Sequence, residues 1–241
     1  MGKSAPARTP AEAADAVKQE ARFGAAFLRV HGRRLLLVFV GLLLPLWGFG
    51  TLVEALHGGE GFPFDRPGLE LAQAMASAGF DHLFAGMSAL GYLYGVVPAD
   101  IALILVLAVR RRFREGLFAA AAVAGSALLN IVAKHAFSRP RPSLWESIAP
   151  ETTYSFPSAH AMGSMTLVAV IVLLCWPTQW RWLTAILGAG FVIMVGLSRI
   201  YLGVHYPSDI LAGWAAALVW TVGVYGLVFS RGRGPWGTHA Q

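Results

Sequence analysis

The sequence predicts an all-α integral membrane protein, a bundle of six transmembrane helices. Hydrophobic residues make up 56% of its 241 residues and charged residues only 13%, whereas soluble domains carry about a quarter charged residues. Several uninterrupted apolar runs reach the roughly 20 residues that a helix needs to cross a bilayer. Short segments rich in Lys and Arg separate some of these runs, as in the cytoplasmic loops of membrane proteins.

Residues 1–34 form a polar amino-terminal arm before the first apolar run. We expect the first ten residues to be disordered and the alanine-rich stretch 10–30 to form an amphipathic helix on the membrane surface. A secretory signal peptide has a shorter leader and ends at a small-residue cleavage site. The run Leu35–Leu56 is therefore interpreted as an uncleaved first span.

Five further spans complete the predicted bundle. A short amphipathic helix is expected near Leu69–Ala78, in the outer loop between the first and second spans. Residues 35–230 form a single predicted domain, and residues 231–241 form a cytoplasmic tail. The remaining predicted spans are Asp81–Val109, Leu117–Phe137, Ser158–Trp176, Trp182–Val204 and Ser208–Phe229.

The distribution of basic residues orients this bundle. Most of the 19 Lys and Arg residues fall in the amino-terminal arm, in the loop after the second span and in the carboxyl-terminal tail. Six spans place these segments on one side, which the positive-inside rule makes cytoplasmic, together with both termini. The net charge of +6 thus reflects topology and gives no reason to expect a nucleic acid partner. The basic residues that fall on the outer side are Arg66, Lys134, Arg139, Arg141 and Arg199.

Three polar clusters lie on that outer side, each at the end of a predicted span. Ionisable side chains at a membrane are costly, so such clusters indicate function. Each residue alone has a structural interpretation, for example a helix N-cap for a serine or a hydrogen-bonded histidine. Their joint occurrence on one face favours a common site. In chain order the side chains are Lys134, Arg141, Ser158, His160, Arg199, His205 and Asp209.

These side chains suit a phosphate group. Two guanidinium groups and one ammonium group match the charge and geometry of a phosphoryl group. Ser158 follows a proline at a helix start, where free backbone N–H groups favour an anion. His205 and Asp209 are four residues apart, so the carboxylate can orient one ring nitrogen and leave the other free. An imidazole oriented in this way suits a nucleophile or a general base.

The clusters resemble the three signature motifs of the type 2 phosphatidic acid phosphatase superfamily, the lipid phosphate phosphatases. That pattern is Lys, six residues, Arg-Pro; then Pro-Ser-Gly-His; then Ser-Arg, five residues, His, three residues, Asp. The resemblance covers about residues 65–229 and includes the six-helix arrangement. The matching residues are Lys134 with Arg141-Pro142, then Pro157-Ser158-Ala159-His160, then Ser198-Arg199 with His205 and Asp209.

The resemblance implies a role for each matching residue. His205 resembles the nucleophile that forms a phosphohistidine, Asp209 the residue that orients it, and His160 the acid that protonates the leaving group. Ala159 replaces the glycine of the motif, which matters only if this residue needs a positive φ. No metal ion and no other cofactor are implied. The expected phosphate ligands are Lys134, Arg141, Ser158, Arg199 and the backbone N–H of Ala159.

The resemblance further implies a hydrolase of the bacterial inner membrane, with its active site at the outer face. It would act on a membrane lipid phosphate: undecaprenyl diphosphate, phosphatidylglycerophosphate, phosphatidate or a lipid A phosphate. The compact six-span form favours the first two. A lipid phosphotransferase that uses the same residues and a non-catalytic lipid-phosphate carrier remain alternatives. No obligate protein partner is expected.

Two charged residues outside the assigned roles also carry expectations. Arg139 competes with Arg141 as a phosphate ligand; the motif favours Arg141, and we expect Arg139 to steer anionic headgroups. Asp100, within the second predicted span, either pairs inside the bundle or marks a kink beside Pro98. The lone cysteine, Cys175, lies inside an apolar run and is assigned to packing.

Overall fold

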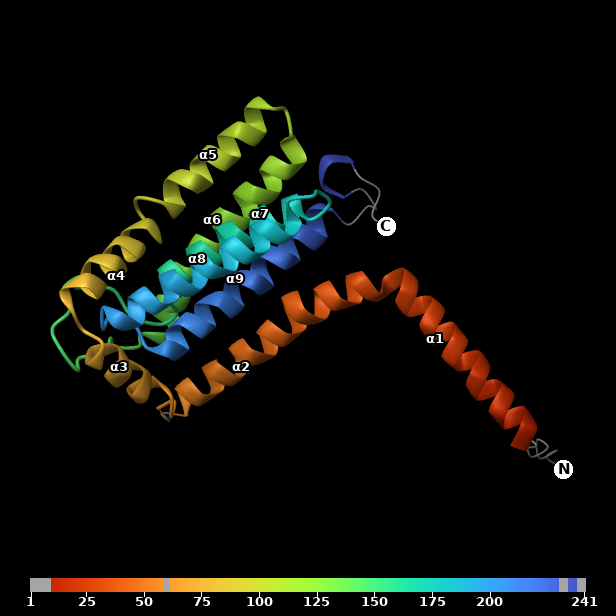
Figure 1. The fold of residues 1–241 in the computed structure, drawn as a ribbon, viewed down its shortest axis with the longest axis horizontal. Coiled ribbons are helices and arrows are strands. Elements are labelled where there is room, and N and C mark those ends of the chain that lie inside the picture. The colour runs from red at the N-terminus through yellow and green to blue at the C-terminus, as the bar shows by residue number, and fades with distance from the viewer. Residues whose placement is uncertain (1–9, 59–60, 230–233, 238–241) are drawn as a thin grey trace.

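The computed structural model describes residues 10–58, 61–229 and 234–237, and every regular element in them is a helix (Figure 1). The predicted all-α class is confirmed for these residues. The elements are α1 (Pro10–Val38), a π-helical turn (Phe39–Leu43), α2 (Leu44–His57), α3 (Asp65–Ala74), α4 (Ala78–Leu90), α5 (Val96–Val109), α6 (Phe113–Phe137), α7 (Ala159–Cys175), α8 (Arg181–Tyr201), α9 (Pro207–Val228) and a short 3-10 turn (Pro235–Gly237).

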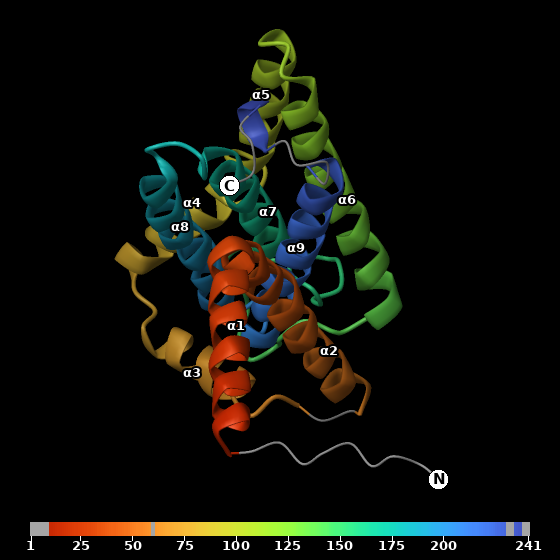
Figure 2. The same cartoon turned by 90° about the vertical axis from the view of Figure 1, so that its right-hand side faces the viewer.

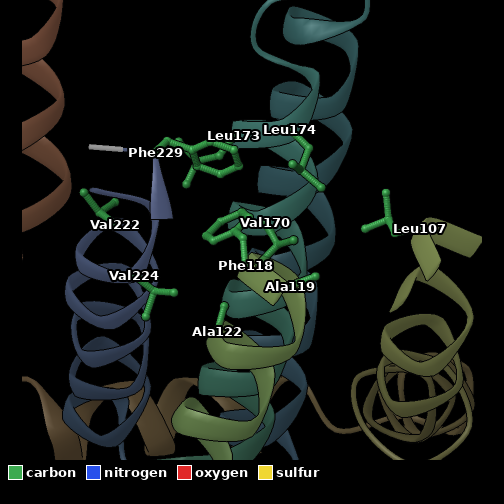
Figure 3. Close-up of a cluster of buried hydrophobic side chains, with 10 residues drawn as sticks. All are labelled: Leu107, Phe118, Ala119, Ala122, Val170, Leu173, Leu174, Val222, Val224 and Phe229. Carbon is green, nitrogen blue, oxygen red and sulfur yellow. The ribbon is translucent and has the colours of Figure 1, made fainter. Parts of the chain in front are cut away.

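Helix α7 is the centre of the bundle, in contact with α6, α8 and α9 (Figure 2). A cluster of buried apolar side chains, drawn in Figure 3, lies between α7 and the helices α5, α6 and α9. Small residues such as Ala119 and Ala122 are fully buried in α6, which lets the neighbouring backbones approach closely. The large members of the cluster include Phe118, Val170 and Phe229.

Four helical segments of the described chain are long and apolar enough to cross a membrane: Leu35–His57, Phe113–Phe137, Arg181–Tyr201 and Pro207–Val228. Helices α5 and α7 are apolar but shorter. The first of the four segments continues α1 through the π-helical turn into α2. Helix α1 bends away from the bundle at this turn (Figure 1). The predicted disorder of the first ten residues concerns residues 1–9, which lie outside the described residues.

The prediction of one continuous span over Asp81–Val109 is wrong, because this stretch forms the two helices α4 and α5. A turn over residues 91–95 separates them. Pro98 lacks an N–H group and is tolerated only in the first turn of a helix, and it stands in the first turn of α5. Gly95 adds a second constraint, since a Cβ there would lie 2.2 Å from the carbonyl oxygen of Leu90.

The segment before α4 contains a short helix whose bounds differ from the expected Leu69–Ala78. Helix α3 begins at Asp65 and ends at Ala74. Ser77 instead caps α4, where its hydroxyl accepts a hydrogen bond from the Phe80 N–H. Serine is a preferred residue at such a position, because it satisfies one of the free N–H groups at a helix start.

Candidate active site

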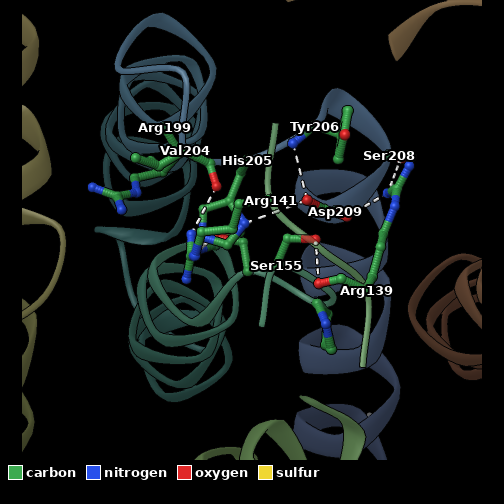
Figure 4. Close-up of polar contacts among 12 residues, drawn as sticks. Arg139, Arg141, Ser155, Arg199, Val204, His205, Tyr206, Ser208 and Asp209 are labelled. Atoms are coloured by element: carbon green, nitrogen blue, oxygen red, sulfur yellow. Dashed lines mark hydrogen bonds and ion pairs between the residues drawn. The ribbon is translucent and has the colours of Figure 1, made fainter. Parts of the chain in front are cut away.

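The three polar clusters meet at one end of the bundle. Helices α6 and α8 end there and α7 and α9 begin there, so the loop 138–158 lies beside the connection 202–206 (Figure 4). All eight residues expected in the site come from these helix ends and loops. The structure brings the side chains of Arg141, Arg199, His160, His205 and Asp209 together, as the distances below show.

The connection between α8 and α9 presents His205 to this site. Gly203 has a φ of +67°, a conformation that glycine adopts without strain, and an added Cβ there would lie 2.6 Å from the Trp145 ring. His205 Nδ1 lies 3.4 Å from Asp209 Oδ2, and neither side chain is exposed to solvent. His205 Nε2 lies 3.1 Å from Arg141 Nη1. One ring nitrogen thus faces a carboxylate and the other faces the cations.

His205 is neutral at neutral pH in this environment. Burial lowers its pKa, and the nearby charges of Arg141 and Arg199 lower it further, so that it lies well below 6.5 even though Glu151 opposes the shift. A neutral imidazole with its Nδ1 proton toward Asp209 has a lone pair on Nε2. That atom can act as a nucleophile.

Three basic side chains act on His205: Arg141 contacts its Nε2, and Arg199 and Lys134 lie near enough for their charges to affect the ring. Arg141 donates to the Thr153 carbonyl (2.6 Å) and to the Val204 carbonyl (2.7 Å), which fixes its guanidinium group. Lys134 is buried and donates to the Tyr154 carbonyl at 2.6 Å. Arg199 is 2% exposed and donates to Ser88 of α4. These cations are therefore held in place by loop and helix atoms.

Glu151 is a site residue that sequence reasoning missed. Its Oε2 accepts from Arg141 Nη2 at 2.6 Å and lies 4.0 Å from His205 Nε2. Its Oε1 accepts from Arg199 and lies 3.8 Å from His160 Nδ1. Burial raises the pKa of Glu151, but Arg199, His205 and Arg141, with Lys134, outweigh it, so the pKa lies below its usual value. An ionised carboxylate therefore occupies the space between both histidines and two arginines.

Ser158 and Ala159 form the start of α7. The Ser158 hydroxyl accepts from the Ala161 N–H at 3.4 Å, as an N-cap does, and the Ser158 N–H donates to the Asp209 carbonyl at 3.1 Å. The non-glycine residues of the described chain that have a positive φ are Arg111, Ser138 and Trp236. Ala159 is not among them, so the replacement of glycine at this position causes no backbone strain.

His160 stacks on a ring from the turn between α4 and α5. The ring centroids of His160 and Tyr92 are 5.0 Å apart, at an interplanar angle of 34°. Within the described part of the chain, Nδ1 of His160 is buried and has no hydrogen-bond partner. The break in the predicted second span thus places an aromatic wall beside this histidine, which hydropathy alone did not indicate.

The position of Arg139 does not fit the expectation that this residue steers anionic headgroups. Its side chain is only 10% exposed and forms ion pairs with Asp65 and Asp209. A guanidinium group enclosed in this way between two carboxylates has no free face for an anionic lipid. Arg141 instead is the arginine of this loop that reaches His205, as the motif predicts.

One carboxyl oxygen of Asp100 has no hydrogen-bond partner among the described residues. This residue is buried in α5, and the oxygen is its Oδ1. The expectation that it pairs inside the bundle is therefore not met by that oxygen. The alternative, a kink beside Pro98, stays a prediction, because α5 runs without interruption from Val96 to Val109.

An open cavity of about 260 Å³ adjoins the basic side chains, on the side of the loop 138–158. It is lined by Arg139, Pro140, Arg141, Glu151, Thr152, Thr153 and Tyr154. A second cavity, of about 370 Å³, lies between α2, α6 and α9 and reaches Pro157, and its walls are almost entirely apolar. A polar cavity thus lies along the loop 138–158, and an apolar cavity reaches the start of α7.

Comparisons with known proteins agree with this geometry. The family model described as "PAP2 superfamily" matches residues 115–233. The chain is 28% identical to the undecaprenyl-diphosphatase of Sulfolobus acidocaldarius, over 72% of this chain and 82% of that protein. It is 35% identical to the decaprenylphosphoryl-5-phosphoribose phosphatase of Mycobacterium tuberculosis, over 70% of this chain and 84% of that one.

The fold also has a counterpart among solved structures. The crystal structure of the transmembrane PAP2 type phosphatidylglycerolphosphate phosphatase from Bacillus subtilis superposes with a TM-score of 0.70 at 23% identity, covering 78% of this chain and 98% of that one. The family model and the two relatives confirm the family inferred from the three motifs. The chain belongs to the PAP2 superfamily, as a membrane lipid phosphatase.

Proposed function

We propose that the protein hydrolyses a membrane lipid phosphate or diphosphate through a phosphohistidine on His205. The observation that carries this proposal is the position of the Glu151 carboxylate. Two arginines bind its oxygens, and both histidines lie within 4.0 Å of them. A carboxylate presents two anionic oxygens, as one face of a phosphoryl group does, so it marks where the phosphoryl group of a substrate binds.

The first chemical step breaks the bond between phosphorus and the leaving oxygen. Nε2 of His205 attacks phosphorus in line with that oxygen, while Asp209 stabilises the charge that develops on the imidazole. His160 starts this step as an imidazolium and donates one proton to the leaving oxygen, which leaves a neutral imidazole. Arg141, Arg199 and the ammonium group of Lys134 stabilise the negative charge on the equatorial oxygens.

The second step releases inorganic phosphate. Water attacks the phosphohistidine, and His160, which has lost its proton in the first step, accepts a proton from that water. The bond between phosphorus and His205 Nε2 breaks, and the imidazole returns to its neutral state. None of these steps calls for a metal ion, so we expect turnover to persist in the presence of a chelator.

The apolar cavity supports a lipid as the substrate. It ends at Pro157, next to the serine that starts α7, so a tail held there brings its headgroup toward the basic side chains. The names of the relatives point to polyprenyl carriers and to phosphatidylglycerophosphate. We propose a polyprenyl diphosphate or phosphatidylglycerophosphate as the substrate of this chain.

We further propose six crossings of the bacterial inner membrane, with both termini in the cytoplasm and the site on the outer face. Helices α4 and α5 together make one crossing, and the others are α2 with the turn before it, α6, α7, α8 and α9. The distribution of Lys and Arg supports this orientation. The substrate then presents its phosphate at the membrane surface while its tails stay in the bilayer.

The decisive experiment measures phosphate release and phosphoenzyme formation by purified protein in detergent, across a panel of lipid phosphates and diphosphates. We expect His205→Ala to abolish both, because the attacking nitrogen is gone. The matched control is His82→Ala, since His82 is exposed on α4. Full phosphate release by His205→Ala would refute the scheme and favour a carrier. Transfer of the phosphate to an added alcohol, detected by product analysis, would identify a phosphotransferase.

A further inference from the structure

Asp65, at the first turn of α3, lies outside the residues matched by the family model but against the catalytic loop. Its Oδ1 accepts from the Ser208 N–H at 2.9 Å. Its Oδ2 accepts from the Ser208 hydroxyl at 2.6 Å and from Arg139 Nη2 at 2.8 Å. Asp65 is 4% exposed. A buried carboxylate with both oxygens satisfied is fixed in position.

Arg139 connects this carboxylate to the one that faces the nucleophile. Its Nη1 donates to Asp209 Oδ1 and, at 2.8 Å, to the Ser208 hydroxyl. The guanidinium carbon also lies 4.1 Å from the centroid of the Tyr206 ring, a stacking that favours a cation. In Figure 4, Arg139 lies on the Asp209 side of the His205–Asp209 pair and Arg141 on the His205 side. Arg139 therefore contacts Asp209 and Arg141 contacts His205, at opposite ends of the His205–Asp209 pair.

The two carboxylate oxygens of Asp209 have different partners. While Oδ1 is held by Arg139, Oδ2 accepts from the Tyr206 N–H at 2.9 Å and lies 3.4 Å from His205 Nδ1. With Oδ1 fixed, the carboxylate cannot rotate away from the imidazole. Removal of Arg139 would leave two buried carboxylates near Ser208 without the cation between them, which is strongly unfavourable for both.

We propose that Asp65 and Arg139 are positioning residues for the reaction, which hold Asp209 and thereby aim His205 at phosphorus. Neither residue touches the substrate: Asp65 acts through Arg139 and Ser208, and Arg139 acts through Asp209. Helix α3, which the motifs do not include, is then a working part of the active site. This inference rests on the proposed role of His205 as the nucleophile.

The test compares Asp65→Asn, Arg139→Gln and Arg139→Lys with Arg66→Gln as the matched control. Arg66 is the neighbour of Asp65 in the sequence, but its side chain is 77% exposed and pairs only with Glu70 on the surface. For each purified full-length variant we would measure kcat and KM on a short-chain phosphatidate and the Kd of inorganic vanadate. Thermal unfolding is recorded in parallel.

A positioning role predicts a split between these measurements. We expect kcat to fall about 100-fold in Arg139→Gln and Asp65→Asn, as when reacting atoms are misplaced by an ångström. KM and the vanadate Kd should stay close to the control values, because Arg141, Arg199 and Lys134 are untouched. Arg139→Lys keeps the charge but cannot bridge both carboxylates, so its kcat should lie between those of Arg139→Gln and the control.

Three outcomes would overturn the proposal. The first is a kcat of Asp65→Asn and Arg139→Gln equal to that of Arg66→Gln. The second is a raised KM with an unchanged kcat, which would make Arg139 a substrate ligand. The third is parallel loss of kcat, vanadate binding and thermal stability in all three variants, Arg139→Lys included, which would reduce the cluster to a structural one. Activity of His205→Ala would refute the proposed function. That measurement does not depend on the Asp65 and Arg139 variants, so the two hypotheses can fail separately.

Discussion

At the scale of single residues, the carboxylate of Glu151 affects how tightly the unliganded site binds a phosphate. It binds Arg141 and Arg199 and lies near both histidines. A phosphoryl group that approaches His205 competes with this carboxylate for the N–H groups of Arg141 and Arg199, and the two negative charges repel each other. The free energy of substrate binding is therefore reduced by the cost of breaking these ion pairs.

Glu151→Gln should consequently strengthen the binding of small anions. The amide removes the negative charge while it keeps the size of the side chain, so Arg141 and Arg199 become available to phosphate. We expect the inhibition constants of inorganic phosphate and vanadate to fall about tenfold, a difference of roughly 1.4 kcal/mol. Inhibition of the purified enzyme measures this, with Glu146→Gln, an exposed acid of the same loop, as the control. Weaker inhibition would show that Glu151 helps to bind phosphate.

The lowered pKa of His205 predicts how kcat/KM depends on pH. A group whose pKa is lowered keeps its neutral, nucleophilic form as the pH falls, so the acid limb of kcat/KM should lie below pH 6.5. Arg141→Gln removes a nearby positive charge that lowers this pKa, and the limb should then move toward neutral pH even though the overall activity is lower. The pH profiles of both enzymes test this. A wild-type limb above pH 6.5 would contradict it.

The residues that sequence spacing identified and those that it missed differ in one physical respect. His205, in the connection 202–206, and Asp209, in the first turn of α9, are only four residues apart, so the short chain between them keeps them close in space. Glu151 reaches the site because the loop 138–158 folds back over it, held by hydrogen bonds such as Ser155 N–H to the Arg139 carbonyl at 2.9 Å. No periodicity in the sequence encodes that path. An acid in a loop on a cation-rich face was the only signal.

At the scale of secondary-structure elements, the turn between α4 and α5 matters most. Length and the lack of charged residues indicated one long span, because residues 82–99 contain no Asp, Glu, Lys or Arg. What breaks the helix is local: Gly95 allows an approach to the Leu90 carbonyl that no other residue permits, and Pro98 must stand in a first turn. The consequence is functional, since the turn carries Tyr92 to His160.

Tyr92→Ala should therefore impair the leaving-group step selectively. Without the ring, His160 loses the surface that holds its imidazole, so kcat should fall about tenfold or more for a lipid phosphate with an alkyl leaving group. A substrate with a nitrophenol leaving group needs no proton and should be turned over at nearly the normal rate. Tyr92→Phe keeps the stacking ring and should resemble the wild type.

The matched control for this experiment is Tyr94→Ala, because Tyr94 lies in the same turn and is 74% exposed. Rates on both substrates are measured for all three variants. An equal loss on both substrates would assign Tyr92 to the stability of the turn, and no loss on either would show that the stacking has no catalytic effect.

At the scale of the whole molecule, the order of helix ends determines the site. Because α6 and α8 end where α7 and α9 begin, every polar motif is delivered to one end of the bundle. This arrangement was predictable from the alternation of spans and polar clusters in the sequence. The four long apolar segments agree with that alternation, while the lengths of α5 and α7 depend on turns that hydropathy does not detect.

The proposed orientation can be tested with single cysteines. In a Cys175→Ser background, Ser143→Cys in the loop between α6 and α7 should react with a membrane-impermeant thiol reagent in intact spheroplasts. Arg110→Cys, in the loop between α5 and α6, should react only after the membrane is opened. Both positions are exposed in the structure. The reverse pattern of labelling would place the active site in the cytoplasm.

The hydrogen bonds from Ser208 to Asp65 have a consequence for how the enzyme is made. They join Asp65, in the first turn of α3, to Ser208, at the start of α9, which is 143 residues further along the chain. During synthesis, spans enter the membrane in order from the amino terminus, so this contact is among the last that can form. A nascent chain that lacks α9 also lacks Asp209, the residue proposed to orient His205. We therefore expect phosphatase activity to appear only after the whole chain, α9 included, has been synthesised and inserted.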